Sequence, residues 1–414
     1  MVLIPIRSDS AYFGFAKQSA QGIAAAPTIF PRWLDGSIEM DMKAEDIWEG
    51  DGSRRLSQVI KNGQSVKIKV NFHPRPLELA FMEHAVMGSG SDAVGSPLLA
   101  TTTTTAIIAA TSTTVTLTSV TGLGASGVVA MALEPGTSNE EIALFQLPAT
   151  GNVLTLVSTY NNGSGKFALA HSSSVAITTS TPHVLTDKVD GDYHTIEVCL
   201  GGLSGGAGPT LRVKDCKCES VKVSGKSGSL IAYEIEWYGI ATTSTGTPAT
   251  VTLEAHSPFF YTSGTWTLNG AMTGDAQNVE SFDIQRKNAL DMTQTENLTM
   301  AAIIFGNLAL DVGLTLVMVN AQLIALTYFG STSGTTDTQA IGSGALNLLF
   351  TQADTFHTVQ YSVPTMHYTK TEPPAPKKDG KHFMLSVAAT GVSNQGASAY
   401  LLQTTVNNTQ TTAY

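Results

Sequence analysis

Two long segments of this chain follow the same order of sequence patterns, and this repetition restricts the possible folds more than any other feature. Residues 36–88 and 278–330 each begin with a short alternating strand, continue through a polar loop, and then show a strongly alternating strand. Each closes with a short helical stretch that ends in glycine, at Gly88 and Gly330, and glycine commonly ends helices. This order predicts two copies of one structural unit.

The repetition continues beyond the helices. Residues 193–244 and 345–393 each contain three further strand-like stretches. Identity between the copies is low and β-rich segments are easily matched, but the agreement of loop lengths and helix position favours a duplication. We therefore predict a first unit formed by residues 1–95 with 186–255, and a second unit within residues 256–414.

Residues 96–185 interrupt the first copy. They contain few charged residues, many threonines, and short alternating runs separated by glycine turns. This pattern is typical of a small all-β module inserted at a loop tip. Residues 1–35 and 397–414 lack a long periodic pattern, and we expect them to be arms that are either frayed or pinned to a neighbouring subunit.

The composition favours strands and limits the possible partners. Hydrophobic residues make up 42% and charged residues 14%, so much of the surface must be neutral, and the β-branched residues favour strands. The net charge of −10 argues against a protein that grips nucleic-acid phosphates with Lys and Arg. It does not exclude a surface along which DNA slides without sticking.

Cellular location is indicated by several missing features. The first residues lack the basic start and continuous apolar run of a signal peptide, and Asp311 interrupts the longest nearly apolar window. We therefore expect synthesis in the cytoplasm and no membrane insertion.

Cys199, Cys216 and Cys218 are too few for a disulfide framework and complete no metal-ligand set.

Catalytic signals are weak. In the strand at 230–238, apolar residues alternate with Glu234 and Glu236, which lie roughly 6–7 Å apart on an extended strand. That spacing does not exclude a glycosidase carboxylate pair, but no aromatic sugar platform is evident, and such alternation is typical of any solvated strand face. Motifs for a metal, a phosphate loop or an activated nucleophile are missing. We predict no enzyme activity and no cofactor or metal.

One loop of the first copy combines a large aromatic residue with two arginines. Trp48 lies in an otherwise polar loop and is followed by Arg54 and Arg55. The loop is either a solvated hairpin loop or an inter-subunit contact, since Trp and Arg are enriched at interface hot spots.

These features together resemble a known family. Residues 36–88 with 190–255 resemble the tail tube proteins of long-tailed bacteriophages, and residues 278–393 resemble the same unit again. The insert is similar to small β-modules of phage virion proteins. The resemblance rests on element order and residue character without an invariant motif, and two tandem units with an insert depart from simpler members of the family.

The resemblance implies a mainly β fold. It consists of two tandem tail-tube-type β-sandwich or barrel domains, each with a flanking short helix, plus the inserted all-β module. Sheets of neighbouring domains would join around a lumen that conducts DNA during ejection. Six such domains per ring are usual in the family, so three chains would complete a pseudo-hexameric ring. The implied partners are other copies of the chain, a tape measure protein, and tail terminator or baseplate proteins, within the virion tail.

Acidic residues are candidates for the lumen, because carboxylates repel DNA phosphate. Our candidates for the lumen or its rim are Glu39, Asp41, Glu234 and Glu236. The insert is expected on the outside of the tube, since a module of that size would block a channel. A capsid decoration or baseplate protein remains an alternative, and a carbohydrate-binding or hydrolysing β-protein is a more distant one.

Overall fold

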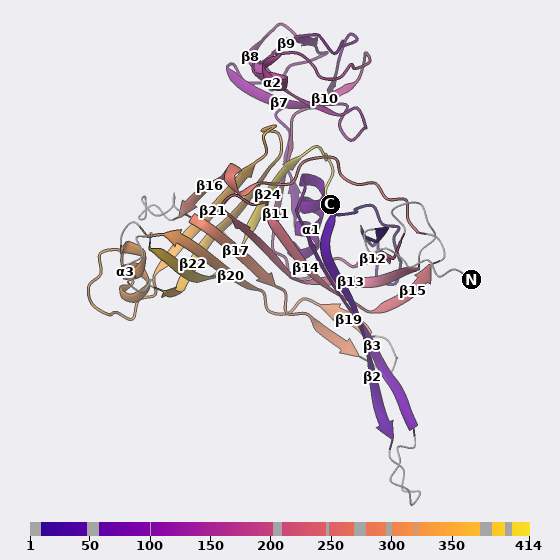
Figure 1. The fold of residues 1–414 in the computed structure, drawn as a ribbon, viewed down its shortest axis with the longest axis vertical. Helices are drawn as coiled ribbons and strands as arrows, with labels where there is room; N and C mark the ends of the chain where they lie inside the picture. Colours follow the sequence, from indigo (N-terminus) through magenta and orange to yellow (C-terminus); the bar gives the residue numbers. More distant parts are fainter. Residues whose placement is uncertain are drawn as a thin grey trace, which may run out of the picture.

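The chain folds mainly into β-strands (Figure 1). One large curved sheet contains strands from both halves of the chain, and a smaller sheet lies at one end of the molecule. The computed structural model describes residues 10–47, 58–99, 101–201, 209–245, 248–268, 279–294, 300–318, 321–372, 383–393 and 400–414.

The first half contributes strands on both sides of the insert. Its elements are β1 (Tyr12–Lys17), β2 (Trp33–Ile47), β3 (Gln58–Phe72), α1 (Pro76–Met87), β4 (Asp92–Val94), β11 (Thr181–Thr186), β12 (His194–Cys199), β13 (Thr210–Lys226), β14 (Ala232–Gly239) and β15 (Ala241–Thr245).

The second half begins after a short 3-10 turn, η2 (Tyr261–Ser263). Its elements are β16 (Gly264–Leu268), β17 (Val279–Lys287), β18 (Asp291–Gln294), β19 (Met300–Ile304), β20 (Ala309–Val317), α3 (Gln322–Phe329), β21 (Ser343–Thr351), β22 (Thr358–Glu372), β23 (Met384–Gly391) and β24 (Gln403–Asn408).

The strand order of the large sheet repeats between the halves. The first half gives β2-β3-β14-β13 and the second gives β17-β20-β23-β22, with β12 on β13 matched by β21 on β22. Every one of these pairs is antiparallel. The two helices hold the same place, because each follows the second strand of its set.

Irregularities in the strand pairing repeat as well. The register between β2 and β3 shifts after Trp33, and that between β17 and β20 shifts after Val279. The β13–β14 ladder shifts after Cys218, and the β22–β23 ladder shifts after Tyr368. A β-bulge is a specific local feature rather than random noise. The bulges therefore fix which residues of the two halves correspond. Ile38 of β2, which pairs with Ile68, corresponds to Ile284 of β17, which pairs with Val312.

The two halves are joined head to tail through strand edges. Residues 220–226 of β13, the last strand of the first set, pair with residues 281–287 of β17, the first strand of the second set. This ladder joins two sets of four into eight consecutive strands of the 16-stranded sheet, and these eight are called the eight-strand sheet below.

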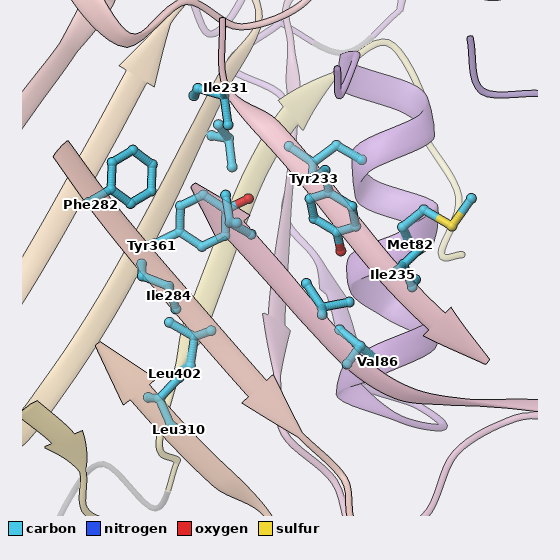
Figure 2. Packing of buried hydrophobic residues seen from close by; sticks show 14 of the residues in the cluster. Met82, Val86, Ile231, Tyr233, Ile235, Phe282, Ile284, Leu310, Tyr361 and Leu402 are labelled. Atoms are coloured by element: carbon cyan, nitrogen blue, oxygen red, sulfur yellow. The ribbon is translucent and has the colours of Figure 1, made fainter. Parts of the chain in front are cut away.

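The core lies on one face of this sheet. Alternate residues of the strands are buried there, as the period of two in β3, β14 and β20 predicts. Figure 2 shows Met82 and Val86 of α1 next to Tyr233 and Ile235 of β14, with Tyr361 and Leu402 supplied by the second half. One buried cluster therefore contains side chains from both halves.

The insert forms its own sheet and core. Its elements are β5 (Thr102–Thr103), β6 (Thr114–Thr116), β7 (Gly127–Leu133), β8 (Glu141–Thr150), β9 (Val153–Leu156), the short helical turn α2 (Tyr160–Gly163) and β10 (Ala176–Thr178). Phe145, Phe167 and Leu154 are buried within it. The boundary expected at residue 185 is too late, since β11 pairs with β24 and β4 of the large sheet.

Two further expectations from the sequence are corrected. The terminal segments were expected to be frayed or pinned to a neighbour, but β1 pairs with β12 and β24 pairs with β22 and β11 of the same chain. The polar loop expected after β17 instead contains β18, which pairs with β19. β18 and β24 are short polar strands, and they gain regularity from their partners rather than from their own patterns.

Candidate assembly surfaces

The eight-strand sheet has an open face opposite the core. Its residues alternate with the buried ones and are half-buried or exposed in the free chain. Most are polar or small, such as Ser220 and Ser224 of β13 and Thr315 of β20. All four lumen candidates, Glu39, Asp41, Glu234 and Glu236, lie on this face.

The glutamates of β14 are paired with lysines of β3. Glu236 lies 2.9 Å from Lys67 Nζ, and Glu234 lies 2.8 Å from Lys69 Nζ. The hydrogen bond that Lys67 donates to Glu236 is the main reason that the pKa of Lys67 is raised. We expected these carboxylates to repel DNA phosphate. In the structure, each of the two is paired with a lysine diagonally across the ladder.

Glu39 and Asp41 lie exposed on β2, next to the same lysine. Glu39 is opposite Lys67 in the ladder, and Asp41 is opposite Ser65. With Tyr238 they line an open hollow on this face. The charge of Glu39 also helps to raise the pKa of Lys67, so the carboxylates of β2 and β14 surround one cation.

The loop between β2 and β3 contains the candidate contact residues. Trp48, Arg54 and Arg55 lie outside the described residues. The strands on either side, β2 and β3, form a long hairpin that leaves the body at the end opposite the insert (Figure 1).

Two strand edges of the eight-strand sheet are open. Among the described residues β2 pairs with β3 alone. At the other end, β22 is flanked by β21 and β24 in its first part, while residues 370–372 pair only with β23 in the described structure. An open edge presents unpaired N–H and C=O groups and is a template for another strand.

A buried polar network joins the halves and was missed by the sequence analysis. The carboxylate of Glu83 in α1 accepts hydrogen bonds from Tyr233 (3.1 Å), Tyr361 (3.4 Å) and Thr404 (3.0 Å). Burial raises the pKa of Glu83, whereas the nearby charge of Arg286 lowers it. A glutamate in the middle of a largely apolar helix was the available signal, and it did not reveal its partners.

A histidine links the insert to the body. His256 Nε2 lies 3.4 Å from Glu140 of the insert, and its Nδ1 lies 2.9 Å from Glu254. Burial lowers the pKa of His256, but the hydrogen bonds that its ring donates to Glu140 and Glu254 outweigh burial and raise the pKa to about 10. Glu254 also accepts from the backbone N–H groups of Leu77 and Glu78 at the start of α1.

Three features bear on other possible roles: the cysteines, clusters of metal-binding side chains, and apolar helices. Cys199, Cys216 and Cys218 are buried and free, and burial raises the pKa of Cys216 and Cys218 well above the usual value. The described residues hold no cluster of three or more His, Cys, Asp or Glu side chains suited to a metal ion. Within the same residues, no helix has the length and apolar character needed to cross a membrane.

Neither a protein-family model nor a curated protein sequence matches this chain. The class of protein is therefore defined by the structure alone, as a mainly β chain with a continuous sheet that spans both halves.

Proposed function

We propose that this chain is the structural subunit of a bacteriophage tail tube, which forms stacked rings around a lumen that conducts DNA. The observation that carries the proposal is the β13–β17 junction. It joins the last strand of one four-strand set to the first strand of the next. Among the described residues, β2 keeps an open edge, and residues 370–372 at the end of β22 pair only with β23.

The same junction can be repeated between chains. A contact between two different edges is heterologous, and it generates a ring when its rotation closes. If residues at the end of β22 pair with β2 of the next copy, each chain adds two four-strand sets to the ring. Three chains then give six sets, the number that the family resemblance implies, and no edge is left open.

The open face suits the wall of a DNA channel. Lys67 and Lys69 on this face are held by Glu236 and Glu234, so these two lysines are poorly available to bind phosphate. Ser, Thr and Gly cover much of the remainder. DNA would therefore pass along this face without specific binding, and Glu39 and Asp41 would add weak repulsion.

Electron microscopy of the purified protein tests the proposal against its alternatives. We expect long hollow tubes whose end-on projections show three identical subunits and six similar lobes. Closed shells would favour a capsid protein, and decorated particle surfaces or a baseplate-like assembly would favour another virion role. Monomers that stay discrete at high concentration, in the presence of the other tail proteins, would contradict the proposal and leave the carbohydrate-related alternative.

A further inference from the structure

The junction inside the chain shows what covers the core-facing side of β17. Asn288, directly after β17, donates from Nδ2 to the backbone oxygen of Val86 at 3.1 Å and to that of Cys218 at 2.9 Å. The guanidinium of Arg286 contacts the sulfur of Met87. The first strand of the second half is therefore seated on the last turn of α1 and on β13, both in the first half.

Within the part of the chain that the structure describes, the corresponding side of β2 has no such cover at Met40 and Met42. The matched bulges place Met40 of β2 at the position of Arg286, and Met42 at the position of Asn288. Met42 is 59% exposed, whereas Asn288 is 2% exposed. Met40 is likewise exposed where Arg286 is buried. Two adjacent exposed methionines on the core-facing side of a strand indicate a missing partner.

The matching surface is exposed at the other end of the chain. When α1 and α3 are aligned at their terminal glycines, Tyr328 corresponds to Val86 and Phe329 to Met87. Tyr328 is 51% exposed, whereas Val86 is 0% exposed. The Tyr328 hydroxyl donates to the backbone oxygen of Thr371 at 3.2 Å, so this turn of α3 is fixed beside the open edge of β22.

We propose that Met40 and Met42 of one copy pack against Tyr328 and Phe329 of a second copy of this chain. The proposal rests on the proposed tube function and names the side chains of its inter-subunit contact. A second copy is the occupant because both exposed surfaces belong to this chain, and because their equivalents are already joined within it. Methionine is flexible and makes favourable contacts with aromatic rings, so the pair is chemically matched.

The sequence gives a reason for an apolar contact at this place. Pro373, Pro374 and Pro376 follow β22 directly in the sequence. Proline cannot donate a backbone hydrogen bond. The ladder between chains must therefore be shorter than the β13–β17 ladder, and side-chain packing has to supply more of the binding. Ile38, Met40, Val198 and Leu211 also line an apolar hollow of about 290 Å³ beside the methionines, which offers further apolar area.

Cysteine cross-linking in assembled protein tests the contact. In the double variant Met42→Cys with Tyr328→Cys, mild oxidation should link neighbouring chains into a ladder that ends at the closed ring. The matched control, Asp41→Cys with Tyr328→Cys, moves the first thiol to the opposite face of β2 and should give no ladder. The native cysteines are buried and should contribute little background.

Each outcome has a defined meaning. If the wild-type protein forms tubes and the assembled double variant gives no cross-link between residues 42 and 328, this contact is overturned and the tube function stands. Wild-type protein that forms no tubes overturns both. If the double variant itself fails to assemble, the single Met42→Cys variant decides. Its thiol should react with maleimide rapidly in the free chain and much more slowly in tubes, and equal reactivity in both would refute the contact. The pair Met40→Glu with Met42→Glu should abolish tubes without lowering the melting temperature of the free chain, whereas Ile107→Glu, an equally drastic change at an exposed site of the insert, should not.

Discussion

The two halves of the molecule share strand order, bulges and helix position, yet they differ on the open face of the sheet. Where the first half places the Lys67–Glu236 pair, the second half has Asp311 and Ala388. The core-facing positions, in contrast, are apolar in both, as in Ile68 and Val312. The comparison shows that the core-facing residues maintain the pairing, while the open face is free to change charge.

The halves differ also in what is added to the shared set of strands. The first half carries the long β2–β3 hairpin and the insert, and the second half replaces the hairpin by the short β18–β19 pair, which packs Ile303 against Ile240 of the first half. The additions lie at the ends of strands and helices, where a longer connection costs little. The shared strands are therefore the part that assembly needs.

Deletion of the insert is the most drastic test of this division. Replacing residues 97–179 by a short Gly-Ser linker should leave the fold and the tubes intact, because the sheet of the insert lies entirely within these residues. Deleting residues 96–185 should prevent folding, because it also removes β11. Loss of the buried Leu185 side chain alone should cost about 2–5 kcal/mol. Circular dichroism and unfolding curves of both deletions measure the difference, and equal stability would refute our placement of β11 in the body.

The helices provide a smaller test, through their first turns. Glu78 in the first turn of α1 is buried, whereas the first turn of α3 has no acidic residue. Burial, with a further contribution from the charge of Glu254, raises the pKa of Glu78 to about 8. The folded chain thus keeps a proton that the unfolded chain releases near pH 4.5, so the contribution of Glu78 to stability falls as pH rises from about 4.5 to 8.

The variant Glu78→Gln should remove this loss. We expect it to be more stable than the wild type by up to about 5 kcal/mol at pH 9, and to differ little below pH 4.5. Loss of the His256 proton near pH 10 affects both proteins equally and cancels in the difference. Urea unfolding of the two proteins across this range is the measurement, and a difference independent of pH would contradict the assignment.

The sequence predicts what depends on local patterns. The alternation of β3, β14 and β20, and the glycines that end α1 and α3, correctly indicate these elements and a mainly β fold. It does not predict which strands become neighbours, because alternation carries no information about the partner. For that reason the Lys67–Glu236 pair and the Glu83 network were not foreseen. Both depend on residues more than a hundred positions apart.

Charge reversal on the open face gives the smallest expected change in stability and the most direct test of the lumen. The double variant Glu234→Lys with Glu236→Lys removes both ion pairs with β3 and places four lysines together. Partly exposed pairs of this kind contribute about 1 kcal/mol or less each, so the fold should survive. Assembled tubes should eject DNA more slowly, because unpaired lysines bind phosphate, and the delay should shrink as salt is raised. Ejection from particles, followed by fluorescence of released DNA, measures the rate.

A charge swap separates the effect of net charge from the effect of altered packing. The quadruple variant with Lys67→Glu, Lys69→Glu, Glu234→Lys and Glu236→Lys restores both pairs in reverse and should eject DNA at the parental rate. A separate double variant carries Ser386→Lys and Ala388→Lys, at the sites of the second half that are equivalent to Glu234 and Glu236. It disrupts neither of the ion pairs with β3 and should slow ejection without a loss of stability. If the double reversal on β14 ejects DNA at the parental rate, the open face does not line the lumen. A delay in the β14 reversal but none at residues 386 and 388 would mean that only the first half of the sheet faces the DNA.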